Sequence, residues 1–212
     1  MKQNLLIVSG IIVVALIFFV NSKRSNNEVS ASKYDVGDKA IDFKLKNIDE
    51  QYVSLEGFTE AKGFIVVFTC NTCPFSKWYE QRIIELDVKY KPLGYPVIAI
   101  NPNDKEVSPG DSFEEMKSRA TSKGYTFPYL YDESQEIAQT YGATRTPHVY
   151  ILNKESDGLK VAYIGAIDNN HKDAAAADKK YVEYAVDNLL EGNAVSTDYT
   201  KAIGCTIKWR NS

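Results

Sequence analysis

Cysteine and histidine are both scarce in this chain of 212 residues, which has three cysteines and two histidines. Three thiols are too few for a fold held together by disulfides, and because the number is odd, at least one thiol stays unpaired or is shared. The chain has a single C-x-x-C pair, and Cys205, His148 and His171 do not complete it at any recognised zinc-site spacing. The cysteine content therefore favours a working pair plus one extra thiol.

Basic side chains are in deficit once the N-terminus is set aside. Residues 1–24 carry three basic and no acidic side chains, so the rest of the chain has 22 basic and 28 acidic residues, a formal net charge of −6. Nucleic acid, which is a polyanion, is therefore not an expected partner. The sequence has no internal repeats, and we predict no cofactor.

One apolar run, Leu5–Val20, has no charged side chain and is flanked by Lys2 on one side and by Lys23 and Arg24 on the other. As a helix, its 16 residues span roughly 24 Å, somewhat less than the ~30 Å hydrocarbon core of a bilayer. We predict that residues 1–24 are either a cleaved signal peptide or a retained membrane anchor. The rest of the chain is then an extracytoplasmic domain of the cell envelope, exported or attached to the membrane through Leu5–Val20.

Apolar periodicity predicts one folded domain over 34–212, joined to the N-terminal segment by a polar tether over 25–33. We expect the helix over 74–90 to bury a face made by Trp78, Ile83, Leu86 and Tyr90. This order of elements predicts an α/β fold with a mixed central sheet flanked by helices. The predicted elements are a hairpin over 43–55, a buried strand over 64–68, a helix over 74–90, a buried strand over 97–100, helices that begin at Ser112 and Asp132 and end near 123 and 141, a hairpin over 148–164, and a helix over 179–190.

The C-x-x-C pair, Cys70 and Cys73, directly follows the apolar run Phe64–Phe68 and precedes Pro74. Because proline fits the first turn of a helix, we expect the pair between the carboxyl end of a buried strand and a helix N-terminus. Unpaired N–H groups and the helix dipole stabilise a thiolate there, and the thiolate is the reactive form of cysteine. This context predicts a redox site. A metal site and an inert buried pair are the alternatives.

Five segments of the predicted domain form a recognisable set. They are Gly37–Leu45, Cys70–Phe75, Ala99–Asp104, Tyr129–Glu136 and Ile203–Trp209. Together they resemble the peroxiredoxin-like branch of the thioredoxin superfamily, the redoxin or AhpC/TSA-type proteins. The resemblance covers essentially all of residues 34–212, and it implies a thioredoxin-like fold and thiol-based redox chemistry.

The resemblance also implies roles for individual residues. Cys70 matches the thioredoxin nucleophile, and Cys73 matches its resolving partner. Thr146 and Pro147 match the loop that holds a cis-proline facing the cysteines in thioredoxins. Thr69 stands where thioredoxins have the tryptophan that precedes the first cysteine.

We therefore expect a thiol–disulfide oxidoreductase that uses a redox-active CNTC pair. The Cys70 thiolate would attack a disulfide, and Cys73 would resolve the resulting mixed disulfide. The expected partners are protein or small-molecule disulfides, together with a redox partner that exchanges electrons with the pair.

Two alternative functions stay open. A thiol-dependent peroxidase would form a sulfenic acid at Cys70 or Cys73. The peroxidase motif P-x-x-x-[TS]-x-x-C is absent, although Arg145 lies about where a peroxidase arginine does. A protein that handles Cu(I) or Zn would use Cys70, Cys73 and His148. Cys205 is expected to be a buried, inert thiol packed under the tail, with a relay thiol as the functional alternative.

Overall fold

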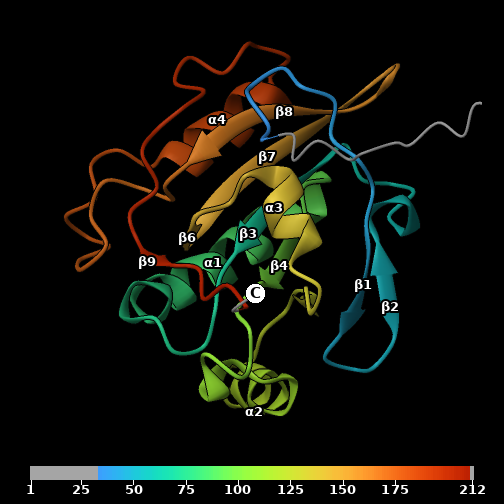
Figure 1. Ribbon diagram of the computed structural model, residues 1–212. Helices are drawn as coiled ribbons and strands as arrows, with labels where there is room; N and C mark the ends of the chain where they lie inside the picture. Colours follow the sequence, from blue (N-terminus) through green and yellow to red (C-terminus); the bar gives the residue numbers. More distant parts are fainter. Residues whose placement is uncertain (1–32, 211–212) are drawn as a thin grey trace, which may run out of the picture. The chain divides into compact units, whose positions relative to one another are not determined.

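A seven-stranded sheet forms the centre of the computed structural model, which describes residues 33–210 (Figure 1). The strand order is β2-β1-β5-β4-β3-β7-β8. The pairs β3–β4 and β4–β5 are parallel and the other neighbours are antiparallel, so the predicted mixed sheet is confirmed. The strands are β1 Lys44–Asn47, β2 Tyr52–Ser54, β3 Gly63–Phe68, β4 Val97–Asn101, β5 Tyr129–Tyr131, β7 His148–Glu155 and β8 Gly158–Gly165.

Helices cover both faces of this sheet. In β3, Ile65 and Val67 pack against the cluster that includes residues of α1, α2 and α4, while Phe64, Val66 and Phe68 pack against the cluster that includes residues of α3. This two-sided burial explains why the strand is apolar at every position. The helices are α1 Pro74–Tyr90, α2 Phe113–Lys123, α3 Glu136–Tyr141 and α4 Tyr181–Leu190, and the short 3-10 turns are η1 Leu55–Gly57, η2 Lys91–Leu93 and η3 Pro109–Asp111.

Local sequence signals place most of these elements correctly. The two hairpins, the buried strands, α1, α2 and α4 lie where the sequence predicts them, and Ser112 accepts the Glu115 N–H at the start of α2 as expected of an N-cap. The helix expected to begin at Asp132 instead begins at Glu136. Asp132 still serves it, because its carboxylate accepts the N–H groups of Ile137 and Ala138.

Two other predictions on the elements need correction. Strand β5 is not among the predicted elements. It has only three residues, and all of them are buried. Trp78 does not belong to the buried face of α1. Its side chain is 44% exposed, and it packs against the rings of Phe75 and His171 instead of against the sheet.

A second, two-stranded sheet joins the C-terminal tail to the domain. Strand β6, Arg145–Thr146, pairs antiparallel with β9, Cys205–Thr206, and places Thr146 opposite Cys205. In Figure 1 the red tail runs beside β6 and the beginning of α1. This pairing brings Cys205 close to Cys73, in the loop that carries the other two cysteines.

The N-terminal predictions lie outside the described residues. The signal peptide or anchor over 1–24 falls there, and so does nearly all of the tether over 25–33. Within residues 33–210, no helix combines the length and apolar character that a membrane span requires.

Candidate active site

The loop from β3 to α1 carries the C-x-x-C pair, as predicted. Cys73 is the N-cap residue of α1 and has an extended backbone, and Pro74 begins the helix. The first N–H groups of a helix have no partner within the helix, so the sulfur of an N-cap cysteine lies in a field that favours negative charge. Cys73 therefore occupies a position in this loop at which the helix N-terminus favours a thiolate.

A disulfide joins Cys73 to Cys205, with 6.0 Å between their Cα atoms. The structure thus differs from the expected Cys70–Cys73 pair. The prediction that Cys205 is a buried thiol is wrong, because Cys205 is bonded and only partly buried. The reason is the β6–β9 pairing, which sets Cys205 opposite Thr146. The two bonded cysteines are 132 positions apart, so no local pattern in the sequence signals this bridge.

Cys70 is the cysteine left as a thiol, and it is buried. Its Sγ lies 3.2 Å from Thr146 Oγ1 and 3.8 Å from Ser76 Oγ. Burial raises the pKa of Cys70 above its ordinary value, and the negative charge of Asp111 raises it further. Hydrogen bonds from Thr146, the Cys73 N–H and Ser76 act in the opposite direction, because they stabilise the thiolate.

Thr146 and Pro147 contact both cysteines of the loop. The bond between them is cis, as the resemblance to thioredoxins implied. The Thr146 carbonyl oxygen lies 3.1 Å from Cys73 Sγ, while its hydroxyl faces Cys70. The first contact is not a hydrogen bond in this state, because a disulfide sulfur carries no proton. Thr146 is completely buried and contacts both sulfurs, one through its hydroxyl and the other through its carbonyl oxygen.

Asp111 holds the cysteine loop in place, and the sequence analysis did not identify it. Its buried carboxylate accepts the backbone N–H groups of Asn71 and Thr72 at 2.7 and 3.1 Å. It also accepts from the side chains of Thr72, Ser108 and Asn103. An acceptor shared by five donors fixes the backbone between the two cysteines. The only sequence signal for it is the turn Ser108–Asp111 before α2.

The auxiliary candidates lie near this site in structural roles. The Arg145 side chain is exposed and donates to Thr206 Oγ1 at 2.8 Å, so it braces β9. Thr69 is buried and its N–H donates to the Ile100 carbonyl at 2.8 Å. His148 is buried, its Nδ1 accepts the Thr144 N–H at 3.4 Å, and burial lowers its pKa to about 4.

No group of three or more His, Cys, Asp or Glu side chains in residues 33–210 is arranged to hold a metal ion. The ligand set expected for the metal-handling alternative was Cys70, Cys73 and His148. In this state the Cys73 sulfur is already bonded to Cys205, and the His148 Nδ1 is engaged by the backbone.

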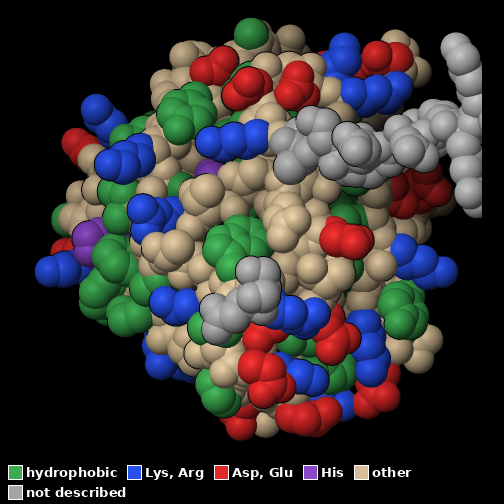
Figure 2. Space-filling view, viewed as in Figure 1, with side chains coloured by type: hydrophobic (Ala, Val, Ile, Leu, Met, Phe, Trp, Pro, Cys, Tyr) green, Lys and Arg blue, Asp and Glu red, His purple; other side chains and the backbone are tan. Residues whose placement is uncertain are grey.

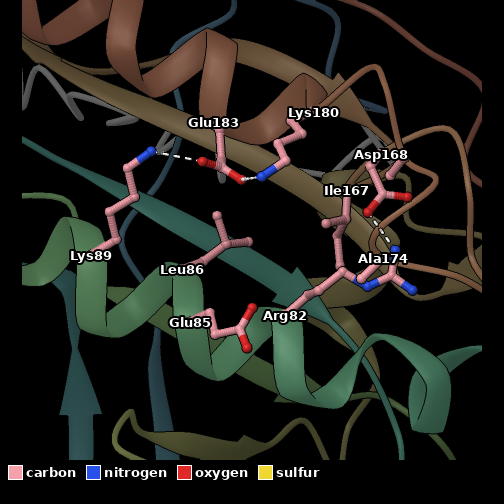
Figure 3. A pocket seen from close by; sticks show the side chains of 10 residues that line it. Arg82, Glu85, Leu86, Lys89, Ile167, Asp168, Ala174, Lys180 and Glu183 are labelled. Carbon is pink, nitrogen blue, oxygen red and sulfur yellow. Dashed lines mark hydrogen bonds and ion pairs between the residues drawn. The ribbon is translucent and has the colours of Figure 1, made fainter.

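A cavity of about 270 Å³ opens between α1 and α4 (Figure 3). Glu183 lies between Lys89 and Lys180 at 2.6 and 3.2 Å, and Arg82 pairs with Asp168. The charged groups of this cavity therefore largely neutralise one another, and its described lining contains no cysteine. The thiol chemistry must lie elsewhere, at the other end of α1.

An exposed aromatic cluster lies beside the cysteine loop. The ring centroids of Phe75, Trp78 and His171 are 4.8 to 5.2 Å apart. Figure 2 shows hydrophobic side chains gathered beside a histidine at the left edge of the molecule. Phe75 and Trp78 stand near the start of α1, whose N-cap is Cys73, so this cluster lies at the same end of the helix as the cysteine loop.

Comparison with known proteins supports the same chemistry. The family model described as the AhpC/TSA family matches residues 36–164. Two solved structures superpose with a TM-score of 0.78. One is an uncharacterized conserved protein from Geobacillus kaustophilus (39% identity, covering 84% of this chain and 94% of that one), and the other is a hypothetical protein from Sinorhizobium meliloti 1021 (30% identity, covering 85% and 98%).

A curated relative carries the activity in its name. Thiol-disulfide oxidoreductase ResA from Halalkalibacterium halodurans is 24% identical over 137 residues, which cover 65% of this chain and 73% of the relative. The predicted thioredoxin-like fold, the predicted resemblance and the predicted class of chemistry are therefore confirmed. The chain belongs to the AhpC/TSA family.

Proposed function

We infer that this chain is a thiol–disulfide oxidoreductase, and we propose that Cys73–Cys205 is its redox-active disulfide. The observation that carries the proposal is the position of this bond. It joins the N-cap of α1 to the tail. Thr146 contacts both Cys73 of this bond and the remaining thiol, Cys70. A bridge with a purely structural role needs neither a helix N-terminus nor a neighbouring thiol.

The exchange begins at Cys205, which is partly exposed, whereas Cys73 is 4% exposed. A substrate thiolate attacks Cys205 Sγ, a new S–S bond forms, and Cys73 leaves as a thiolate. Cys73 is the better leaving group, because the N-terminus of α1 stabilises its negative charge.

A second substrate thiolate completes the reaction by attacking the substrate sulfur of the mixed disulfide. Cys205 then leaves as a thiolate, and the two substrate sulfurs end in one disulfide. Two substrate thiols have been oxidised, and the protein disulfide has been reduced to two thiols. The same steps in reverse reduce a substrate disulfide, and the direction follows the potential of the partner.

Thr146, Pro147 and Cys70 complete the proposed catalytic set. The Thr146 hydroxyl is placed to stabilise a Cys70 thiolate, and its carbonyl is placed to accept an S–H bond from reduced Cys73. Arg145 supports the set indirectly through its bond to Thr206 in β9.

The substrates we propose are disulfides or dithiols. The aromatic cluster of Phe75, Trp78 and His171 at the start of α1 favours proteins over small molecules as substrates. We also propose that the domain works in the cell envelope, with Leu5–Val20 as its export signal or anchor. Fractionation of cells that express the full chain tests this, and recovery of the protein entirely in the cytosol would refute it.

The activity is tested by the reduction of insulin with dithiothreitol as electron donor. We expect the full chain to accelerate insulin reduction and Cys73→Ser to fall to the uncatalysed rate. Thr121→Ser, an exposed change in α2, is the control and should match the wild type. Undiminished activity of Cys73→Ser would overturn the proposal. A parallel assay with hydrogen peroxide tests the peroxidase alternative, for which peroxide turnover without insulin reduction would be the supporting result.

A further inference from the structure

All three cysteines lie next to Thr146. Its hydroxyl lies 3.2 Å from Cys70 Sγ, its carbonyl oxygen lies 3.1 Å from Cys73 Sγ, and its backbone pairs with Cys205. Ser76 Oγ, in the first turn of α1, lies 3.8 Å from Cys70 Sγ, so this sulfur lies beside the start of the helix. The C-x-x-C spacing is one at which two cysteines form a disulfide. Cys73 therefore lies between two possible partners.

We propose that Cys70 is a third catalytic thiol that exchanges with the Cys73–Cys205 disulfide, so that the chain alternates between a Cys73–Cys205 and a Cys70–Cys73 bond. This inference rests on the proposed function, because it gives an internal route to the same disulfide. It assigns Cys205 the role of the thiol that exchanges with the outside, and Cys70 the role of the internal nucleophile.

The step is balanced within the protein. The Cys70 thiol loses its proton, and the thiolate attacks Cys73 Sγ to form the Cys70–Cys73 bond. The Cys73–Cys205 bond breaks, Cys205 leaves with the bonding electron pair, and it takes up a proton. One thiol and one disulfide are present before and after the step, so no outside oxidant or reductant is needed.

The exchange moves the free thiol from the interior to the surface. Cys70 is 4% exposed, whereas Cys205 is partly exposed, so a partner protein reaches the thiol only after the exchange. Electrons can thus pass between the buried C-x-x-C pair and an outside partner through Cys205.

The tail stays in place when its disulfide opens. Lys208 N–H donates to Asn103 Oδ1 at 2.9 Å, and the Lys208 carbonyl accepts from Gln135 Nε2 at 2.9 Å. The Arg210 N–H donates to Gln135 Oε1 at 2.8 Å, and its guanidinium pairs with Asp104. These contacts hold Cys205 near Cys73 without the covalent bond, which makes the exchange reversible.

The pairing is tested by labelling the oxidised full chain with iodoacetamide under native conditions. After an acid quench, peptide mapping by mass spectrometry identifies the labelled cysteine and the remaining disulfide. We expect the label on Cys205 and not on Cys70, with a Cys70–Cys73 bond trapped in the same molecules. Label on Cys70 with Cys73–Cys205 intact, or no label at all, would overturn the inference. Cys70→Ser is the control, and it should keep Cys73–Cys205 and take no label.

A second variant tests the same inference without the tail disulfide. Cys205→Ser treated with oxidised glutathione should form an intramolecular Cys70–Cys73 bond, and a persistent glutathione adduct would count against it. Circular dichroism checks that this variant is folded, and if it is not, the mapping of the wild type decides alone. Insulin reduction separates the two hypotheses. Turnover that needs Cys73, with label only on Cys70, would refute the exchange alone. Label on Cys205 with a Cys70–Cys73 bond, but without turnover, would refute the proposed function alone.

Discussion

At the scale of single residues, Asp111 acts on the cysteine loop in two ways. It fixes the backbone of Asn71 and Thr72, and it also places a negative charge near Cys70. These two effects oppose each other for an exchange reaction, because the first orders the nucleophile and the second discourages its ionisation. Removing only the charge should therefore change the ionisation of Cys70 in a known direction.

Asp111→Asn should lower the pKa of Cys70, because burial remains but the neighbouring negative charge is lost. The measurement is the pH dependence of Cys70 alkylation in a Cys73→Ser/Cys205→Ser background, where Cys70 is the only thiol. We expect the profile to move to lower pH. Glu114→Gln, on the exposed side of α2, is the control. An unchanged profile, or one displaced to higher pH, would contradict this electrostatic account.

His148 should make the native state sensitive to acid. Burial, with a contribution from the positive charge of Lys33, lowers the pKa of His148 from 6.5 to about 4. Between these two pH values the histidine is protonated in the unfolded chain and neutral in the native state. Stability is therefore lost as the pH falls through this window, by about 2 kcal/mol between pH 7 and pH 5. Urea unfolding should show that His148→Asn loses about 2 kcal/mol less than the wild type over that interval. Equal losses in the two proteins would show that His148 titrates normally.

At the scale of elements, the short pair β6–β9 decides which cysteines meet. Gly204 precedes β9 and passes close to the Thr146 backbone, where a Cβ would lie 2.7 Å from the carbonyl carbon. Real Cβ atoms do not approach backbone so closely. A side chain at this position must therefore push the tail away from β6.

Gly204→Ala should slow the formation of the Cys73–Cys205 disulfide, since the displaced tail holds Cys205 away from Cys73. We expect a penalty of about 1–3 kcal/mol for the crowding. The assay follows re-formation of the bond in reduced protein after oxidised glutathione is added, with alkylation and mass mapping. Gly57→Ala is a matched control, because its nearest neighbour is Ser54 Oγ at 3.9 Å. Equal rates for both variants would argue against β6–β9 as the determinant of the pairing.

The elements also explain how far sequence reasoning reaches. Strand β3 is apolar throughout and β4 is apolar up to its last residue, Asn101, because both faces of each strand are buried. Pro74 marks the first turn of α1, so these elements could be predicted. Strand β9 has two residues and pairs with a segment far away in the sequence, so it leaves no periodic signal. The expected Cys70–Cys73 pairing followed from local spacing alone. The observed bridge depends on that remote pairing.

Asp111 and Trp78 show the same limit at single positions. Asp111 lies in a turn, and its side chain accepts the backbone N–H groups of Asn71 and Thr72. Nothing in the local sequence pattern indicates these two partners. Trp78 fits the apolar spacing of α1, but its ring packs with Phe75 and His171, residues whose meeting depends on the loop after β8. Tertiary contacts decide both cases.

At the scale of the whole molecule, the Cys73–Cys205 bond closes a loop across most of the domain. The two residues are 132 positions apart, and a cross-link over a loop of roughly 100 residues removes enough unfolded-state entropy to stabilise a fold by about 4–5 kcal/mol. We propose that this bond opens during turnover. The stability of the domain should then depend on its redox state.

Reduction should therefore destabilise the domain by about 2–5 kcal/mol. The measurement is urea unfolding of Cys70→Ser with and without reductant, since this variant has no spare thiol that could rearrange the bond. The midpoint should fall when the bond is reduced. Coincident midpoints would mean that the cross-link contributes nothing to stability, as it would if the unfolded chain were already restrained.

The most direct test of the central claim follows the Cys73–Cys205 bond during turnover. The full chain reduces insulin in the presence of dithiothreitol, samples are quenched in acid at intervals, and free thiols and disulfides are mapped by mass spectrometry. Our account predicts that the bond opens and re-forms at least as fast as insulin is reduced. A Cys73–Cys205 bond that stays intact in every molecule while insulin is reduced through many turnovers would contradict it.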